Sequence, residues 1–217
     1  MPDRRRRRLE AEQARCAAIS RRAPVLGKWL WLLFWLVIPS NVAGLMTQDA
    51  VKELFPGLYT FGEILALASG IAYASILVRL KSEDEGYRTA GICILIGYAS
   101  SFLLNLLGGS EMAILAILIA LPGVAVSLYG NYREYMAHST VLAGVDNDLS
   151  GKWETLWKWE IGTFCLMIGG VILVALLPLI GALATLAGAI GTIVIGILKL
   201  VYLYQTAKVF REYNAAF

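Results

Sequence analysis

The chain contains six stretches that are each long enough and apolar enough to cross a lipid bilayer. They run approximately over 29–46, 58–78, 90–108, 112–131, 161–177 and 179–204. About 20 mostly apolar residues are needed to cross a hydrocarbon core of about 30 Å. Hydrophobic residues make up 58% of the chain, more than the roughly 45–50% of ordinary soluble domains. The sequence therefore predicts an all-α integral membrane protein with six transmembrane helices.

The basic residues lie almost entirely on one side of these stretches. Of the 19 Lys and Arg residues, all but Lys52 fall before the first stretch, in the second-to-third or fourth-to-fifth connection, or near the C-terminal end. Positive side chains near membrane ends are retained on the cytoplasmic side. With an even number of spans, both termini are expected in the cytoplasm, and we expect the membrane to be a bacterial plasma membrane.

This topology divides the chain into three parts. Residues 1–28 form a basic cytoplasmic arm, 29–204 form the six-helix bundle with a cytoplasmic connection at about 132–160, and 205–217 form a cytoplasmic tail. Outer connections after the third and fifth spans are short and inner ones are longer and charged, so the spans are predicted to form three helical hairpins that open toward the cytoplasm. Pro178 and Gly181 favour a tight reversal between the last two spans.

A cleavable signal peptide is a competing interpretation of the N-terminal region, because a basic segment precedes an apolar core and small residues that end at Ala43. The basic segment is unusually long for a signal peptide, and the apolar run continues to Met46. A retained arm followed by a first span is therefore favoured.

Two fragments of the sequence resemble each other. Gly27-Lys28-Trp29 with Leu32 and Trp35 matches Gly151-Lys152-Trp153 with Leu156 and Trp159, position for position. Related hairpins would explain the match, since parallel repeats occur in some transporters. Recurrent aromatic and basic anchors at the inner membrane interface would explain it equally well.

Small residues recur at every fourth position of two spans. They are Gly62, Ala66, Gly70 and Ala74 in the second span, and Ala184, Gly188, Thr192 and Gly196 in the sixth. Lipid tails are as apolar as Leu, so helices in a membrane associate through close backbone approach at small residues. We expect these stripes to form helix-packing faces that line the centre of the bundle.

Ionisable and polar residues inside spans are the usual markers of function in membrane proteins. Here the ionisable candidates Glu63, Glu160 and Lys199 are shallow, and Asn105 lies toward the outer end of the third span. Glu63, Asn105 and Lys199 are the weak substrate-binding candidates. The long stem of Lys199 is expected to snorkel to the headgroups. Because no span has a central Asp, Glu, Arg or His, a proton- or sodium-coupled transporter is disfavoured.

Pro39 lies inside the first span, where it removes a backbone hydrogen bond. The sequence Pro39-Ser40-Asn41 is compatible with a discontinuous helix that opens a polar notch. Repair of the lost bond by neighbouring groups is the simpler interpretation, since Pro is common in membrane helices.

The segment 146–151 resembles the first half of a calcium-binding loop, but the twelfth position holds Trp157 where a Glu ligand is needed. A polar turn in which Asp148 or Ser150 caps a helix beginning near Lys152 is favoured. We therefore expect no bound metal here.

No catalytic motif is recognisable. The chain has one histidine, His138, in the predicted cytoplasmic connection, and no phosphate-binding loop or zinc pattern. Three cysteines, Cys16, Cys93 and Cys165, lack paired spacing and are expected to act as small apolar fillers. The sequence therefore disfavours an enzyme and predicts no cofactor and no metal.

The run Arg4, Arg5, Arg6, Arg7 and Arg8 is expected to contact anionic lipid, at about 1 kcal/mol per basic residue near the surface. Without interleaved aromatic residues, the run offers no means of reading nucleic acid. Residues 9–19 are expected to form a short helix on the membrane surface.

Three functions fit these patterns. A non-enzymatic scaffold or accessory subunit would bind another membrane protein or itself. It is favoured by the absence of a polar core in the spans and by the two stripes of small residues. A transporter or channel for a lipid-like or apolar small molecule is the alternative, and a membrane-embedded enzyme comes third. A cavity that runs between the hairpins and is lined by Ser69, Ser100, Asn105 or Thr185 would favour transport, whereas a close-packed, dry centre would favour the scaffold.

Overall fold

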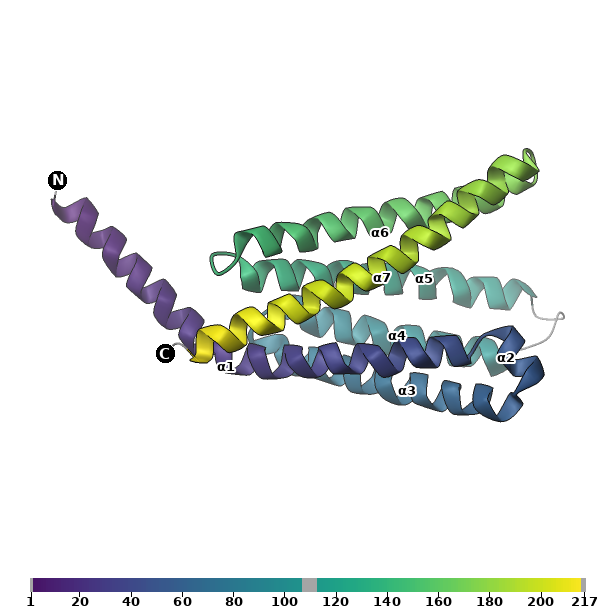
Figure 1. The fold of residues 1–217 in the computed structure, drawn as a ribbon, viewed down its shortest axis with the longest axis horizontal. Helices are drawn as coiled ribbons and strands as arrows, with labels where there is room; N and C mark the ends of the chain where they lie inside the picture. Colours follow the sequence, from purple (N-terminus) through teal and green to yellow (C-terminus); the bar gives the residue numbers. More distant parts are fainter. Residues whose placement is uncertain (1, 107–112, 216–217) are drawn as a thin grey trace.

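The computed structural model describes residues 2–106 and 113–215. These residues form helices joined by short turns, with no strand among them (Figure 1). The elements are α1 (Pro2–Met46), α2 (Asp49–Leu54), α3 (Pro56–Arg79), the short 3-10 helix η1 (Leu80–Ser82), α4 (Glu85–Leu106), α5 (Ala113–Leu142), α6 (Asn147–Val174) and α7 (Pro178–Ala215). The predicted all-helical chain with six helices long and apolar enough to cross a membrane is confirmed over this part of the chain.

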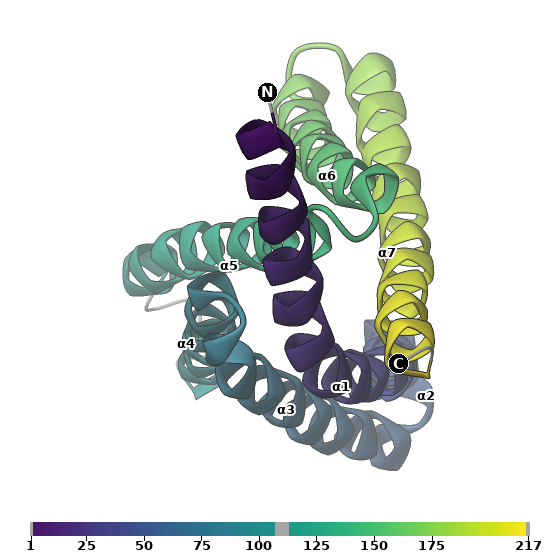
Figure 2. The same ribbon diagram turned by 90° about the vertical axis from the view of Figure 1, so that its left-hand side faces the viewer.

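The six long helices form a closed ring. Each one packs against the next in chain order, and α1 packs against α7. Figure 2, which views the molecule from one end, shows this order around the ring. Residues far apart in sequence can therefore meet across the interior.

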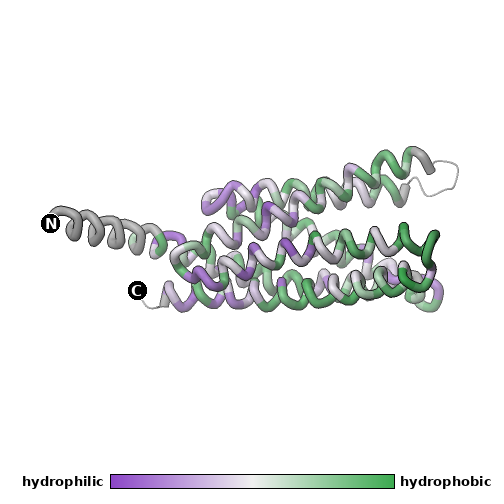
Figure 3. The backbone as a smooth tube through the Cα atoms, turned by 90° about the horizontal axis from the view of Figure 1, so that it is seen from above, coloured by the Kyte–Doolittle hydropathy of each residue, from purple (hydrophilic) through white to green (hydrophobic). Residues whose placement is uncertain are grey.

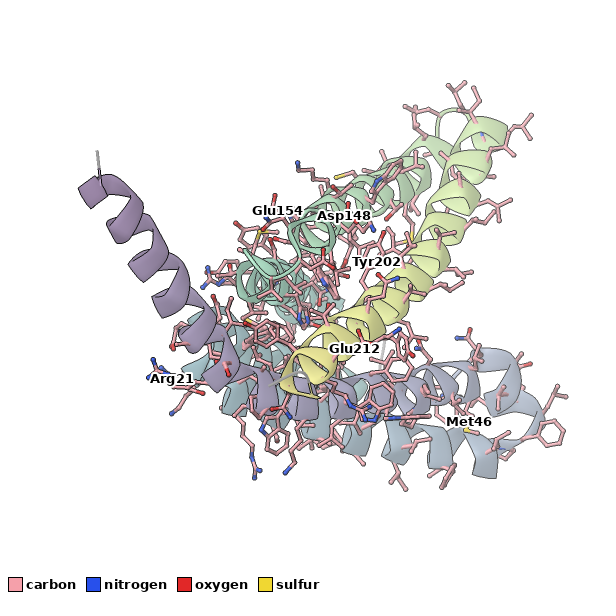
Figure 4. All side chains as sticks on the ribbon, turned by 60° about the vertical axis from the view of Figure 1, so that its left-hand side comes forward. Arg21, Met46, Asp148, Glu154, Tyr202 and Glu212 are labelled. Carbon is pink, nitrogen blue, oxygen red and sulfur yellow. The ribbon has the colours of Figure 1, made fainter. Side chains whose placement is uncertain are left out.

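The two ends of the ring differ in chemistry. The C-terminus and the turns after α3 and α5 lie at one end, here called the basic end, while α2 and the turn between α6 and α7 lie at the other, here called the apolar end (Figure 1). Hydrophobic residues dominate toward the apolar end in Figure 3. In Figure 4, Arg21 and Glu212 mark the basic end and Met46 lies toward the apolar end.

The buried core is concentrated at the basic end. Every long helix contributes a fully buried side chain there: Leu30, Leu77, Tyr87, Tyr135, Trp153 and Phe210. At the apolar end, large side chains such as Leu45 and Leu176 are 71% and 76% exposed. In a bilayer such exposure would carry no penalty, because lipid tails are as apolar as the side chains themselves. The basic end therefore supplies most of the interior packing.

The predicted connection at 132–160 is mostly helix. It belongs to α5 up to Leu142 and to α6 from Asn147, so that only 143–146 lie outside the two helices. Helix α6 is capped by Asp146, whose side chain accepts a hydrogen bond from the Leu149 N–H at 2.9 Å. The predicted capping by Asp148 or Ser150 is wrong, because the helix begins a turn earlier than expected.

Helix α1 is continuous from Pro2 to Met46, so the separate surface helix expected at 9–19 is not present. Pro39 does not interrupt it. The Ser40 hydroxyl donates to the Leu36 carbonyl and the Asn41 amide to the Val37 carbonyl, each at 3.0 Å. Neither bond reaches the Trp35 carbonyl, which is the one left without a donor by the missing Pro39 N–H, but both tie polar side chains to the helix beside it.

The backbone of Arg4–Arg8 belongs to α1, but the side chains of these five residues fall outside the described part of the chain. The same holds for the Asn105 side chain in α4. The proposed roles of both stay predictions.

Several of the small residues lie where helices approach closely. A Cβ added to Gly62 would lie 2.6 Å from Met46 Cβ of α1, and one added to Gly188 would lie 2.9 Å from the Met167 backbone nitrogen of α6. A Cβ on Gly70 would overlap the Tyr98 ring of α4. These glycines allow α3 and α7 to contact their neighbours, whereas Gly196 faces open space. That the stripes as a whole are helix-packing faces stays a prediction.

We predict that Gly188→Leu destabilises the protein while Gly169→Leu does not. A side chain at 188 must displace the backbone of α6, and overpacking of this kind costs about 1–3 kcal/mol. Gly169 of α6 has nothing within 4 Å of an added Cβ. Thermal unfolding in detergent would compare the two variants, and an equal midpoint would contradict the assignment of Gly188 to a tight α6/α7 contact.

Candidate functional site

A cluster of polar side chains is buried within the ring near the basic end. At its centre is Glu134 of α5, which is 0% exposed. The Lys199 ammonium of α7 lies 3.1 Å from each Glu134 carboxylate oxygen. The Tyr73 hydroxyl of α3 donates to Oε1 of the same carboxylate. One carboxylate therefore joins three helices that are far apart in sequence.

His138 extends this cluster along α5. Its Nε2 lies 3.7 Å from Glu134 Oε1, and its Nδ1 lies 3.0 Å from the Tyr87 hydroxyl of α4. The Trp153 ring of α6 stacks on the imidazole at a centroid distance of 4.3 Å. The Trp153 indole N–H donates to the Thr206 hydroxyl of α7 at 3.0 Å. We call Tyr73, Tyr87, Glu134, His138 and Lys199 the Glu134 cluster.

The charges within the cluster are matched. A buried ion pair is tolerated only where its geometry is good and further hydrogen bonds satisfy the remaining lone pairs. Glu134 meets this condition, because Lys199 contacts both oxygens and Tyr73 donates to one of them. Lys199 also lies 5.2 Å from the Tyr135 ring centroid, within the range of a cation–π interaction. The prediction that Lys199 snorkels to the headgroups is wrong, because its side chain turns inward to Glu134.

Three adjoining cavities lie on the apolar side of the cluster, with volumes of about 320, 270 and 350 Å³. The first two share Ile94 and Tyr98 in their linings, and the last two share Ser127 and Asn131. We call these three cavities the vestibule. All six long helices contribute small or polar residues to it: Ser40 and Asn41 from α1, Gly70 and Tyr73 from α3, Tyr98, Ser100 and Ser101 from α4, Ser127 and Asn131 from α5, Glu160 from α6, and Gly196 and Lys199 from α7.

The vestibule is bounded by fixed polar contacts. The Asn131 amide donates to Glu160 Oε1 at 2.8 Å, which joins α5 to α6. The Ser40 hydroxyl, which also bonds its own helix, lies 3.0 Å from the Ser69 hydroxyl of α3. Tyr73 and Lys199 belong to both the vestibule lining and the Glu134 cluster, so the cluster closes the vestibule on its basic side.

The residues of α5 that line this interior follow one helix face. Ser127, Asn131, Glu134 and His138 are spaced by four, three and four residues, which places them on one side of an α-helix. The sequence therefore carried a signal for the cluster, namely Glu134 and His138 one turn apart. The apolar run of the fourth span ends at residue 131, so hydropathy alone places His138 in a connection and gives no reason to pair it with Glu134.

Of the other predicted substrate-binding residues, Glu63 lies apart from the cluster and the Asn105 side chain falls outside the described residues. Glu63 is exposed on α3, toward the apolar end. Cys93 is buried and Cys165 is exposed, and each is a free thiol. Among the described residues, no group of three or more His, Cys, Asp or Glu side chains is placed to hold a metal ion. Of the three weak candidates from the sequence, only Lys199 is found in the cluster.

The chain matches no protein-family model, no curated protein and no solved structure. Any function must therefore be argued from the geometry of the Glu134 cluster and the vestibule.

We predict that Lys199→Met is more destabilising than Glu134→Gln. Loss of Lys199 leaves a fully buried carboxylate without a counter-charge, which costs about 3–5 kcal/mol. Loss of the Glu134 charge should destabilise the protein less, because the Lys199 ammonium that it leaves unpaired is not fully buried. The Lys199 side chain is 21% exposed and borders the vestibule.

A double-mutant cycle followed by thermal unfolding would check this prediction, with Lys152→Met as the control at an exposed ion pair. The double variant Glu134→Gln/Lys199→Met should be more stable than Lys199→Met alone. Strictly additive losses would show that the two side chains do not act as a pair.

Proposed function

We propose that the protein is a multi-pass membrane protein of the transport class, which takes a small lipid-like molecule into the vestibule. The observation that carries this proposal is that all six helices supply small or polar residues to cavities inside the ring. A scaffold needs only a close-packed centre. The presence of Ser100 in the vestibule lining meets the criterion set out above for favouring transport.

Polar groups inside a membrane bundle are expensive and usually mark a pathway for a substrate or ion. The vestibule offers hydrogen-bond donors at Asn41, Tyr98 and Lys199, and apolar side chains such as Ile94 and Phe164 lie beside them. A molecule with a polar head and an apolar body would therefore find partners for both parts. Ligand sites of this kind combine a mostly apolar wall with a few placed polar groups.

The proposal includes an orientation. The hairpins are α1 with α3, α4 with α5, and α6 with α7, and they open toward the cytoplasm. The basic end and both termini then face the cytoplasm of a bacterium, because 18 of the 19 basic residues fall on that side of the spans. In this orientation the Glu134 cluster closes the vestibule on its cytoplasmic side. The vestibule then lies toward the opposite side of the membrane. Exposed apolar side chains of the ring face lipid.

We predict that Gly196→Leu fills the vestibule and removes its ligand without unfolding the protein. Gly196 lines the vestibule, and an added Cβ there meets nothing within 4 Å. Gly169→Leu is the matched control, because Gly169 has equal space and lies outside the vestibule lining.

The test is native mass spectrometry of each variant extracted gently from its own membranes. The unmodified protein and Gly169→Leu should carry one bound small molecule that is enriched over bulk lipid, and Gly196→Leu should lose it by at least about tenfold, or about 1.4 kcal/mol. A stoichiometric protein partner with no enriched small molecule would instead favour the scaffold function.

A further inference from the structure

A groove between α1 and α7 at the basic end is lined by two cationic side chains. Its volume is about 510 Å³, and its lining includes Gly27, Lys28 and Trp31 of α1 with Arg211 and Asn214 of α7. Among the described residues that line it, none is acidic. The groove is separate from the vestibule and shares no lining residue with it.

Gly27 brings the two helices together at this point. A Cβ on Gly27 would lie 3.1 Å from Arg211 Cγ and 3.2 Å from the Arg211 backbone nitrogen. The close approach places Lys28 and Arg211 along the same groove. Both side chains are exposed, so their charges are available to a ligand from outside the ring.

Neither cation is paired with a carboxylate among the described side chains. Arg211 lies 4.5 Å from the Trp31 ring centroid, and Lys28 lies 5.5 Å from the Trp29 ring centroid. A cation–π contact orients a guanidinium or ammonium but leaves its N–H groups free to donate.

Two acids at the basic end already have other partners. Glu212, which follows Arg211, pairs with Lys208 at 3.6 Å, and Glu83 pairs with Arg22 at 3.5 Å. The groove therefore holds two positive charges that the rest of the described structure does not neutralise.

We propose that this groove binds the phosphate of an anionic phospholipid headgroup. The Arg211 guanidinium can donate two parallel hydrogen bonds to phosphate oxygens, and Lys28 adds a second charge. The Asn214 amide offers a further donor to the headgroup. Basic pockets between membrane helices on the cytoplasmic side are suited to anionic headgroups.

A lipid fits the groove better than a free phosphate ester does. Leu32 also lines the groove, and Trp35 follows it along α1 toward the apolar end with 53% of its surface exposed. An acyl chain that leaves the headgroup site can therefore lie along this exposed apolar face of α1. Trp31 lies beside the charges, at the level where Trp side chains mark a membrane interface.

The chain contains an internal comparison for this site. Gly151 and Lys152 occupy the positions of Gly27 and Lys28 in the repeated fragment, and they line a second groove of about 400 Å³ between α6 and α7. There Lys152 forms an ion pair with Asp148, which also lines that groove. Figure 4 shows Asp148 on α6 and Tyr202 on α7 beside this groove. The α6/α7 groove has its cation neutralised, so we expect no anionic lipid there.

The test uses the full chain in detergent, titrated with dioctanoyl phosphatidylglycerol and followed by native mass spectrometry. The zwitterionic dioctanoyl phosphatidylcholine is the comparison lipid. One phosphatidylglycerol should bind at least about tenfold more tightly than phosphatidylcholine. The variant Lys28→Gln/Arg211→Gln should lose this preference, and Lys152→Gln should retain it.

Two further arms separate the sources of binding. Glycerol 3-phosphate supplies a phosphate ester without acyl chains, and it should bind at least about tenfold more weakly than phosphatidylglycerol. A variant with Arg4–Arg8 changed to Gln should keep the single tight site, because that site lies at Lys28 and Arg211. Unchanged thermal unfolding of Lys28→Gln/Arg211→Gln would show that the loss of binding is not a loss of fold.

Three results would overturn the proposal. The first is equal binding of the two lipids by the unmodified protein. The second is an equal effect of Lys152→Gln and of Lys28→Gln/Arg211→Gln on phosphatidylglycerol binding. The third is equal affinity for glycerol 3-phosphate and phosphatidylglycerol, which would assign the groove to a free phosphate ester.

Discussion

The contact between the Glu134 carboxylate and Lys199 is the interaction on which the arrangement of this ring depends. Apolar helices in lipid gain little by contacting one another, so polar contacts and close backbone approach must decide which helices are neighbours. Glu134 of α5 bonds to Tyr73 of α3 and to Lys199 of α7, across the interior of the ring. Because an unpaired carboxylate is far more costly than a paired one in such a place, this contact favours one arrangement of the three helices over others.

The contact between Glu134 and Lys199 lies between two regions of the molecule that differ in how closely their side chains pack. On the basic side, aromatic and aliphatic side chains from all six long helices are fully buried around His138 and Trp153. On the apolar side, few side chains are buried and the helices line the partly open vestibule. A well-packed base fixes the geometry of the polar groups above it, as the proposed uptake of a small molecule into the vestibule requires.

Much of the fold could be predicted from sequence, because hydrophobic length and backbone pairing in lipid leave few alternatives. The six helices and the break at Pro178 followed from the apolar runs and a helix-starting proline. The helical continuation of α5 beyond residue 131 could not be recognised in this way. Its residues look polar in sequence, and they are helical because their polar face meets partners inside the ring.

The site was harder to predict than the fold for the same reason. Glu134 and His138 are four residues apart, but the residues that give them a role are distant: Tyr73 lies 61 residues and Lys199 lies 65 residues from Glu134. Only the closure of the ring brings these partners together. Lys199 is one of the candidates that the sequence offers, yet the direction of its side chain depends on Glu134, and snorkelling is the expectation in the absence of that partner.

The placement of the closed and open ends is tested most directly by the reactivity of single cysteines in sealed vesicles. The chain used has its own cysteines replaced. If the Glu134 cluster closes the basic end and the vestibule opens at the other, Ser127→Cys should react with a membrane-impermeant thiol reagent added on the side opposite the termini. Leu118→Cys, nine residues before Ser127 and therefore on the opposite, exposed face of the same helix, should not react from either side, because that face is expected to meet lipid. Reaction of Ser127→Cys only from the side of the termini, or from neither side, would contradict the account.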